Sequence, residues 1–146
     1  MREIVVHCAA TLPAWMAGRP LSEKRAEIRR WHTDPKSRGG RGWKDIGYHW
    51  LVDRDGKVIA GRAETTIGAH VEGHNRGTLG ICLIGGHGAS TNDRFGDHFT
   101  AAQNAALRRL IREISGRTRI TTISGHYQYA NKACPGFRVD RWLKEV

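Results

Sequence analysis

The segment from Thr100 to Gly116 constrains the fold more than any other part of the chain. Thr100 and Gln103 have the spacing of a capping box, which satisfies the first backbone N–H groups of a helix. Apolar residues then recur at the three- and four-residue spacing of one helix face, at Leu107, Leu110, Ile111 and Ile114. Gly116 is a plausible C-terminal stop. We therefore expect a long helix that buries one face against another layer.

Short apolar and β-branched runs predict the strands of that layer, and they occupy residues 3–8, 48–52, 57–60, 80–84 and 119–123. A second helix is expected from an N-cap at Ser22 to Trp31 or His32. A short closing helix is expected over residues 139–145, capped near Asp140. The resulting order β-α-β-β-β-α-β-α predicts an α/β fold, with one mixed central sheet packed with helices. The length of 146 residues fits a single domain spanning 1–146.

Composition limits the partners that this domain can have. No stretch approaches the roughly 20 apolar residues of a membrane span, so no membrane partner is expected. The formal net charge of +10 favours polyanions such as nucleic acid, anionic lipid or an acidic cell wall. The basic residues are scattered and form no recognised nucleic-acid motif, so no nucleic-acid partner is expected. The first residues make a poor secretory signal, which favours a location in the host cytoplasm.

The three cysteines differ in their surroundings, and an odd number cannot all pair within the chain. Cys8 and Cys82 lie in strand-like segments and are expected in the core. Cys134 lies in a polar loop, which suits a metal ligand or a reactive thiol better than a core residue.

Three side chains suit zinc, namely His7, His126 and Cys134. His126 and Cys134 stand eight residues apart in one glycine-containing loop, and His7 ends a predicted strand. These spacings match no local zinc-finger pattern. On spacing alone, a structural role for each of these residues stays open.

A set of short motifs extends over nearly the whole chain in a fixed order. They are residues 7–11 (HCAAT), 42–49 (GWKDIGYH), 55–56 (DG), 60–62 (AGR), 68–70 (GAH), 80–86 (GICLIGG), 125–126 (GH) and 132–137 (KACPGF). This ordered set resembles the zinc N-acetylmuramoyl-L-alanine amidases, a family that includes amidase-type phage lysozymes and peptidoglycan recognition proteins. The chain is most similar to the small phage enzymes, because it is little more than a catalytic domain.

The resemblance implies a reaction centre. It implies that His7, His126 and Cys134 bind one catalytic Zn²⁺ per chain, and that Tyr48 and Lys132 assist the chemistry. No H-E-x-x-H motif supplies a helix-borne glutamate base.

The resemblance also implies contacts with substrate. Trp43 and Arg62 match positions that contact the stem peptide in peptidoglycan recognition proteins. Arg62 can pair with a peptide carboxylate. His70 and Asn75 lie in a loop that is expected to border the cleft, where either a substrate contact or a structural role fits.

The remaining tryptophan and histidine side chains are expected to serve in packing or to lie at the surface. His49 should point to the face opposite Tyr48 and support the packing. The other histidines outside the motifs are expected at the surface: His32, His74, His87 and His98. The remaining tryptophans are expected in the core: Trp15, Trp31, Trp50 and Trp142.

The function that these expectations favour is zinc-dependent hydrolysis of the bond between N-acetylmuramic acid and L-alanine in peptidoglycan. The chain would be a monomeric phage or prophage endolysin, released to the wall by a holin, with any regulatory protein partner unknown. Four alternatives stay open: a non-catalytic peptidoglycan-binding module, a cytoplasmic wall-recycling amidase, a polymerase partner, and a cysteine hydrolase with Cys134 as nucleophile.

Overall fold

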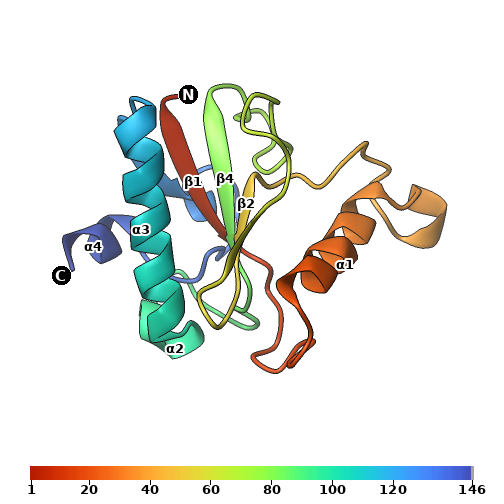
Figure 1. The fold of residues 1–146 in the computed structure, drawn as a ribbon, viewed down its shortest axis with the longest axis horizontal. Coiled ribbons are helices and arrows are strands. Elements are labelled where there is room, and N and C mark those ends of the chain that lie inside the picture. Colours follow the sequence, from red (N-terminus) through yellow and green to blue (C-terminus); the bar gives the residue numbers. More distant parts are fainter. Residues whose placement is uncertain (146) are drawn as a thin grey trace.

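A computed structural model describes residues 1–145 and contains one five-stranded sheet (Figure 1). The strands are β1 (Glu3–Cys8), β2 (Trp50–Val52), β3 (Val58–Ala60), β4 (Thr78–Leu83) and β5 (Thr122–Gly125), in the spatial order β3-β2-β4-β1-β5. β1 pairs in parallel with β4 and β5, and β2 pairs in parallel with β4. Only the hairpin partner β3 is antiparallel among the described strands. The sheet is therefore mixed, as predicted.

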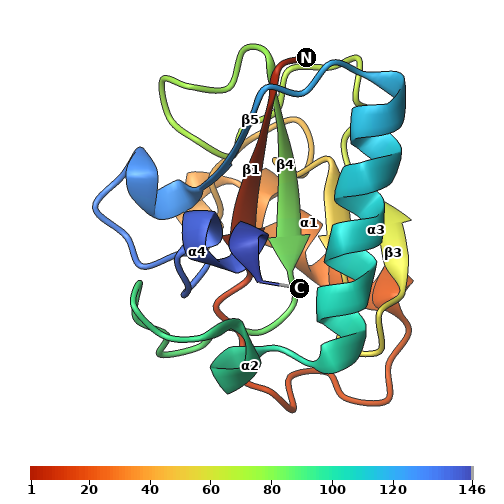
Figure 2. The ribbon, with the colours of Figure 1, turned by 90° about the vertical axis from the view of Figure 1, so that its left-hand side faces the viewer.

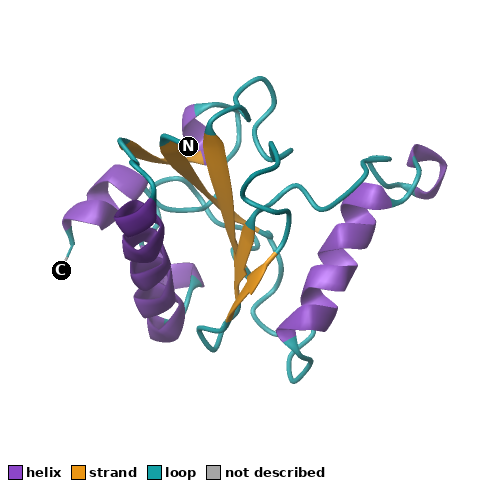
Figure 3. Cartoon of the chain, turned by 45° about the horizontal axis from the view of Figure 1, so that its top comes forward, coloured by secondary structure: helices purple, strands orange, loops and turns teal. Residues whose placement is uncertain are grey.

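Helices cover both faces of the sheet. α1 (Leu21–Thr33) lies on one side, and α3 (Ala101–Arg117) lies on the other (Figure 1). The short helices α2 (Phe95–His98) and α4 (Val139–Lys144) lie on the α3 side, which faces the viewer in Figure 2. Two 3₁₀ turns, Lys36–Arg38 and His126–Gln128, complete the regular structure. Figure 3 shows the strands enclosed between the two helical layers.

The two faces of the central strands carry different side chains, because successive residues of a strand point to opposite sides. Ile4, Val6 and Cys8 of β1 join the large apolar cluster beneath α3. Leu107 and Ile114 of α3 fill the same cluster and are fully buried. The opposite face holds a smaller cluster with α1 and also carries His7. This alternation places the candidate ligand on the α1 side of the sheet.

The predicted fold class is confirmed, and the capping box of the long helix is present. Gly116 is not the predicted stop, because α3 continues to Arg117. Two predicted N-terminal caps are also wrong. α1 starts at Leu21 after Pro20, whose preset φ of −62° serves as the cap, so Ser22 lies inside the first turn. α4 starts after Arg138, so Asp140 also lies inside its helix.

Two further elements differ from expectation. The last strand begins three residues later than predicted, because it is fixed by pairing Glu3 with Thr122 rather than by local β propensity. α2 has only four residues and no periodicity that sequence can display, so it was not expected. Among the described residues, none of the helices is both long and apolar enough to cross a membrane.

Candidate active site

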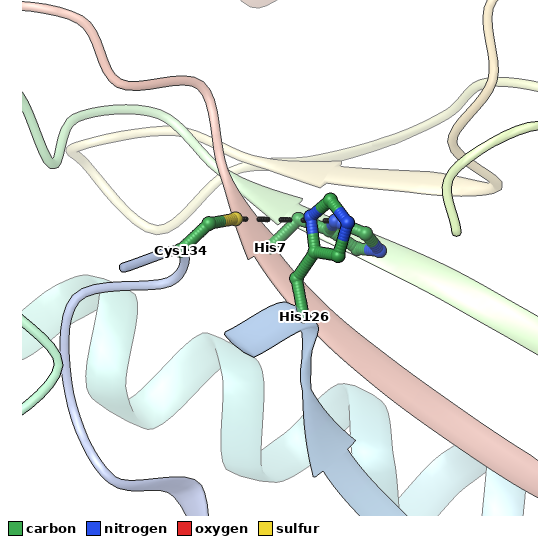
Figure 4. A group of neighbouring side chains, drawn as sticks. All are labelled: His7, His126 and Cys134. Atoms are coloured by element: carbon green, nitrogen blue, oxygen red, sulfur yellow. Dashed lines mark hydrogen bonds between the residues drawn. The ribbon is translucent and has the colours of Figure 1, made fainter. Parts of the chain in front are cut away.

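Three predicted ligands converge at the carboxyl end of β1. One nitrogen each of His7 and His126 and the sulfur of Cys134 lie within 4.8 Å of one another (Figure 4). His7 is almost fully buried, and the other two side chains are partly exposed. The ring centroids of His7 and His126 are 4.6 Å apart. The structure therefore brings together, from opposite ends of the chain, a group that could hold a metal ion.

Backbone pairing explains how these side chains meet. His7 lies on a strand held between β4 and β5. His126 directly follows β5, and the backbone N–H of Tyr127 donates to the carbonyl of Cys134 at 2.9 Å. That hydrogen bond closes the loop on which both ligands lie, so His126 and Cys134 return to the same point beside β1.

The sulfur of Cys134 lies against Cys8. The backbone N–H of Cys8 donates to Cys134 Sγ at 3.1 Å, a contact that suits a sulfur ligand carrying negative charge. The side-chain contact with Cys8 and burial raise the pKa of the Cys134 thiol well above its usual range. Without a cation beside it, Cys134 is therefore a neutral thiol and a weak nucleophile.

Both ligand histidines are neutral at neutral pH. Burial lowers the pKa of His7 well below 6.5, and the nearby His70, His126 and Lys132 lower it further. Burial and the charge of Lys132 also lower the pKa of His126. Each ring therefore offers a lone pair. Two imidazole nitrogens and one cysteine sulfur form a donor set that fits a soft or borderline divalent ion.

A cleft opens around this group. Its lining includes the two predicted catalytic side chains, Tyr48 and Lys132. It also includes the two partly exposed candidate ligands, His126 and Cys134. One wall comes from the end of α1 and the loop that follows: Trp31, His32, Arg41 and Trp43. Two other loops also contribute to the lining, with Val71, Asn75, Tyr129 and Gly136 among their residues.

Tyr48 and Lys132 occupy different positions in the cleft. The ring of Tyr48 lies beside His7, with centroids 5.2 Å apart. Burial raises the pKa of Tyr48 well above 10, so its phenol keeps its proton at neutral pH. Lys132 is exposed on the ligand loop, and its charge acts on both ligand histidines.

Of the four predicted substrate contacts, the structure brings three to the cleft. Trp43 lines it, and the guanidinium of Arg41 lies 5.1 Å from the centre of its ring. His70 and Asn75 also line the cleft, although both are engaged in hydrogen bonds within the protein. Arg62 is not in the lining, and its guanidinium donates to the carbonyls of Asp45, Ile46 and Ile67.

The expected burial of His32 and Trp31 was wrong, and one residue of the cleft was missed. His32 is buried rather than exposed, because its Nδ1 accepts a hydrogen bond from the N–H of Gly47 beneath the cleft. Trp31 is 38% exposed rather than in the core, because it lies at the end of α1 on the cleft wall. Arg41 was not singled out, although its place directly before the Gly42–Trp43 motif was the available signal.

The remaining expectations for these residue types have mixed outcomes. His49 is fully buried and hydrogen-bonded, as expected for a packing residue. Trp142 is in the core, whereas Trp15 and Trp50 are only partly buried. His87 is exposed, but His74 and His98 are partly buried because each faces a carboxylate.

Fold and site together define a small α/β domain with a two-histidine, one-cysteine group at the base of a cleft. The model of the family described as N-acetylmuramoyl-L-alanine amidase matches residues 1–137. The endolysin of Escherichia phage T7 is 38% identical over 142 residues, which cover 97% of this chain and 85% of that protein. The chain therefore belongs to the N-acetylmuramoyl-L-alanine amidase family.

Solved structures share this fold. The amidase LysC from Clostridium intestinale has a TM-score of 0.71 at 24% identity, covering 97% of this chain and 81% of that one. Peptidoglycan recognition protein LE in complex with tracheal cytotoxin, a monomeric diaminopimelic acid-type peptidoglycan, has a TM-score of 0.73 at 27% identity. That likeness covers 97% of this chain and 79% of the recognition protein. Both confirm the predicted amidase-like fold.

Proposed function

We propose that this chain is a zinc-dependent N-acetylmuramoyl-L-alanine amidase that acts on peptidoglycan as a phage endolysin. The single observation that carries the proposal is the convergence of His7, His126 and Cys134 at the base of a cleft in a member of this family. The T7 relative is itself named an endolysin.

The proposed ligands are His7, His126 and Cys134, and their donor atoms suit Zn²⁺. Catalytic zinc sites use three protein ligands and keep one position for water or substrate, which this set of three would allow. A zinc ion held there would polarise the scissile carbonyl as a Lewis acid and lower the pKa of a coordinated water. The N–H of Cys8 holds the ligand sulfur, and the loop hydrogen bond from Tyr127 keeps both loop ligands in place.

The other two catalytic assignments follow from position. Lys132 lies on the same loop as two ligands and projects a fixed positive charge into the cleft. We assign it to stabilise the negative charge that develops on the carbonyl oxygen of the attacked amide. Tyr48 lies beside His7 and keeps its phenol proton, which suits it to donate a hydrogen bond and orient a reacting group rather than to act as a base.

The cleft suits a glycopeptide substrate. Trp43 offers an aromatic surface, and the guanidinium of Arg41 beside it can pair with a carboxylate of the stem peptide. Arg62, in contrast, has three carbonyl acceptors inside the protein. We therefore favour Arg41 over Arg62 as the cation that meets substrate. The net charge of +10 would add general attraction to an acidic cell wall.

Organisation and release remain part of the proposal. We propose that the chain works as one domain and as a monomer, with one zinc ion. Release from the host cytoplasm by a holin, and the identity of any regulatory partner, stay predictions from the family resemblance.

The test is cleavage of purified peptidoglycan by zinc-loaded protein, with new L-alanine amino termini and new reducing sugars measured separately. Amino termini without reducing sugars, lost with a chelator and restored by zinc, would support the proposal. Cys134→Ser and His126→Ala should be inactive, while His87→Ala, an exposed histidine outside the cleft lining, should match the wild type.

Two outcomes would favour the alternatives. Binding to peptidoglycan without any cleavage by zinc-loaded protein would indicate the non-catalytic binding module. Cleavage that resists chelation but requires Cys134 would indicate a cysteine hydrolase.

A further inference from the structure

A second histidine lies directly behind the candidate metal group. The Nδ1 atom of His70 lies 2.8 Å from Nε2 of His7, and His70 Nε2 lies 3.1 Å from Oγ1 of Thr78. All three residues are at most 7% exposed. His70 therefore connects a ligand to a hydroxyl group on β4, on the side of His7 that faces away from Cys134.

The hydrogen-bond directions along this chain follow from the acceptor at its far end. Thr78 Oγ1 lies 2.8 Å from the carbonyl oxygen of Asn75, which can only accept, so the hydroxyl proton points there. The oxygen of Thr78 then accepts from His70 Nε2–H. In a neutral imidazole the other nitrogen carries a lone pair, so His70 Nδ1 accepts a hydrogen bond from His7 Nε2–H.

This order assigns the atoms of His7. With its proton on Nε2, the lone pair of His7 is on Nδ1, the atom that lies 3.9 Å from Cys134 Sγ. We propose that His70, oriented by Thr78, is a positioning residue that holds His7 in the tautomer able to bind a metal through Nδ1. The inference rests on the proposed metal site and deepens it.

The His70 ring packs against Gly80, which has no side chain. A Cβ atom built on Gly80 would lie 2.6 Å from His70 Cγ and 2.9 Å from its Nδ1, closer than side chains approach one another. Gly80 is in the middle of β4, where a glycine weakens a strand unless another group must come close. The bare backbone at Gly80 thus allows the His70 ring to lie over the sheet between Thr78 and His7.

The loop that carries His70 is fixed as well. The side-chain oxygen of Asn75 accepts from the backbone N–H groups of His70 and Val71, each at 2.9 Å. The backbone carbonyl of Asn75 accepts a hydrogen bond from the hydroxyl of Thr78. Asn75 therefore sets both the backbone that carries His70 and the hydroxyl that orients its ring. This accounts for two residues that the sequence associated with substrate.

The first test is the tautomer of His7 in metal-free protein, read from two-bond ¹H–¹⁵N correlations of the imidazoles. The expected spectrum has a proton on Nε2 of both His7 and His70. A proton on Nδ1 of His7 would overturn the proposal. This readout needs neither zinc nor activity, so it stands even if the amidase proposal fails.

The second test is zinc affinity, measured by competition with a chromogenic chelator. His70→Leu should weaken binding by roughly 10–100-fold, the usual effect of losing a partner behind a metal ligand. His70→Gln can still accept from His7 and donate to Thr78, so it should stay within a few-fold of wild type. His98→Gln removes a partly buried histidine elsewhere and should leave the affinity unchanged.

Variants at Thr78 separate positioning from packing. Thr78→Val keeps the shape but cannot accept from His70, so His7 should populate both tautomers and bind zinc more weakly, whereas Thr78→Ser should behave as wild type. If His70→Leu does not fold, the comparison of Thr78→Val with Thr78→Ser still decides. Wild-type zinc affinity and a single His7 tautomer in Thr78→Val would refute the proposal.

Discussion

Glu3 offers a sharp test of how the amino end of the sheet is held together. Its carboxylate is 4% exposed on β1 and accepts hydrogen bonds from Ser124 and Tyr129, while His74 lies 2.9 Å away. These partners belong to β5, to the residue after the second 3₁₀ turn, and to the loop of the cleft wall. Replacing Glu3 with Gln keeps the size of the side chain and removes its charge.

The loss of stability in Glu3→Gln can be worked out from its individual hydrogen bonds. A hydrogen bond to a charged acceptor stabilises a protein by about 1.5–3 kcal/mol and a neutral one by about 0.5–1.5 kcal/mol. Neutralising an acceptor of three such bonds should therefore lower the free energy of unfolding by about 3 kcal/mol at pH 7. The exposed Glu113→Gln is the matched control and should change it by less than about 0.5 kcal/mol.

The effect should also depend on pH. Burial by itself raises the pKa of Glu3, but the hydrogen bonds from Ser124, Tyr129 and His74 outweigh it, so the pKa lies below 4.5. A lowered carboxyl pKa stabilises the folded state above the unfolded pKa, and that stability is lost as the pH falls through the folded pKa. The difference between wild type and Glu3→Gln should therefore shrink below pH 4.5.

Urea unfolding followed by tryptophan fluorescence at pH 7 and at pH 3 measures both quantities. Equal stability of Glu3→Gln and wild type at pH 7 would refute the reasoning. So would a difference of the same size at the two pH values, since the charge of Glu3 would then contribute nothing.

Three further predictions concern the core and the cleft. Leu107→Ala should lower the free energy of unfolding by about 2–5 kcal/mol in urea titrations, because the side chain is fully buried beneath the sheet. Lys132→Ala should lower kcat by roughly 10²–10³ at nearly unchanged zinc affinity, since in the proposed site the lysine would stabilise charge without being a ligand. Arg41→Ala should raise KM more than Arg62→Ala, whereas Arg62→Ala should lower the urea midpoint more, because Arg62 donates to three carbonyls; the reverse pattern would return the substrate role to Arg62.

Sequence was sufficient for the fold wherever local chemistry and tertiary packing agree. The capping box at Thr100 and the apolar stripe from Leu107 to Ile114 define α3, and the continuous apolar run of β1 defines a buried strand. Sequence failed at the ends of elements that depend on distant partners. β5 takes its register from Glu3, and no feature of residues 119–121 shows that pairing.

The site divides in the same way. The three candidate ligands and Tyr48 were singled out through motifs, and the structure brings all four side chains to one cleft or its base. The sequence singled out His70 but did not show its hydrogen bond with His7, since that bond joins positions 63 residues apart. His32 was misplaced for the same reason, because its partner is a backbone N–H at Gly47 that no side-chain pattern reveals.

Successive side chains of β1 point to opposite faces of the sheet, so this one strand contributes both to the core and to the candidate site. Its even positions, Ile4, Val6 and Cys8, fill the core beneath α3, while Glu3 and His7 face the other side. Glu3 there anchors the loops of one end, and His7 meets the other ligands at the opposite end. A shift of one residue in the pairing register of β1 would exchange its two faces. His7 would then point into the apolar core, and Ile4 would point to the face that now carries Glu3 and His7. Core packing and ligand geometry therefore select the same register, so stabilising the sheet also stabilises the reaction centre.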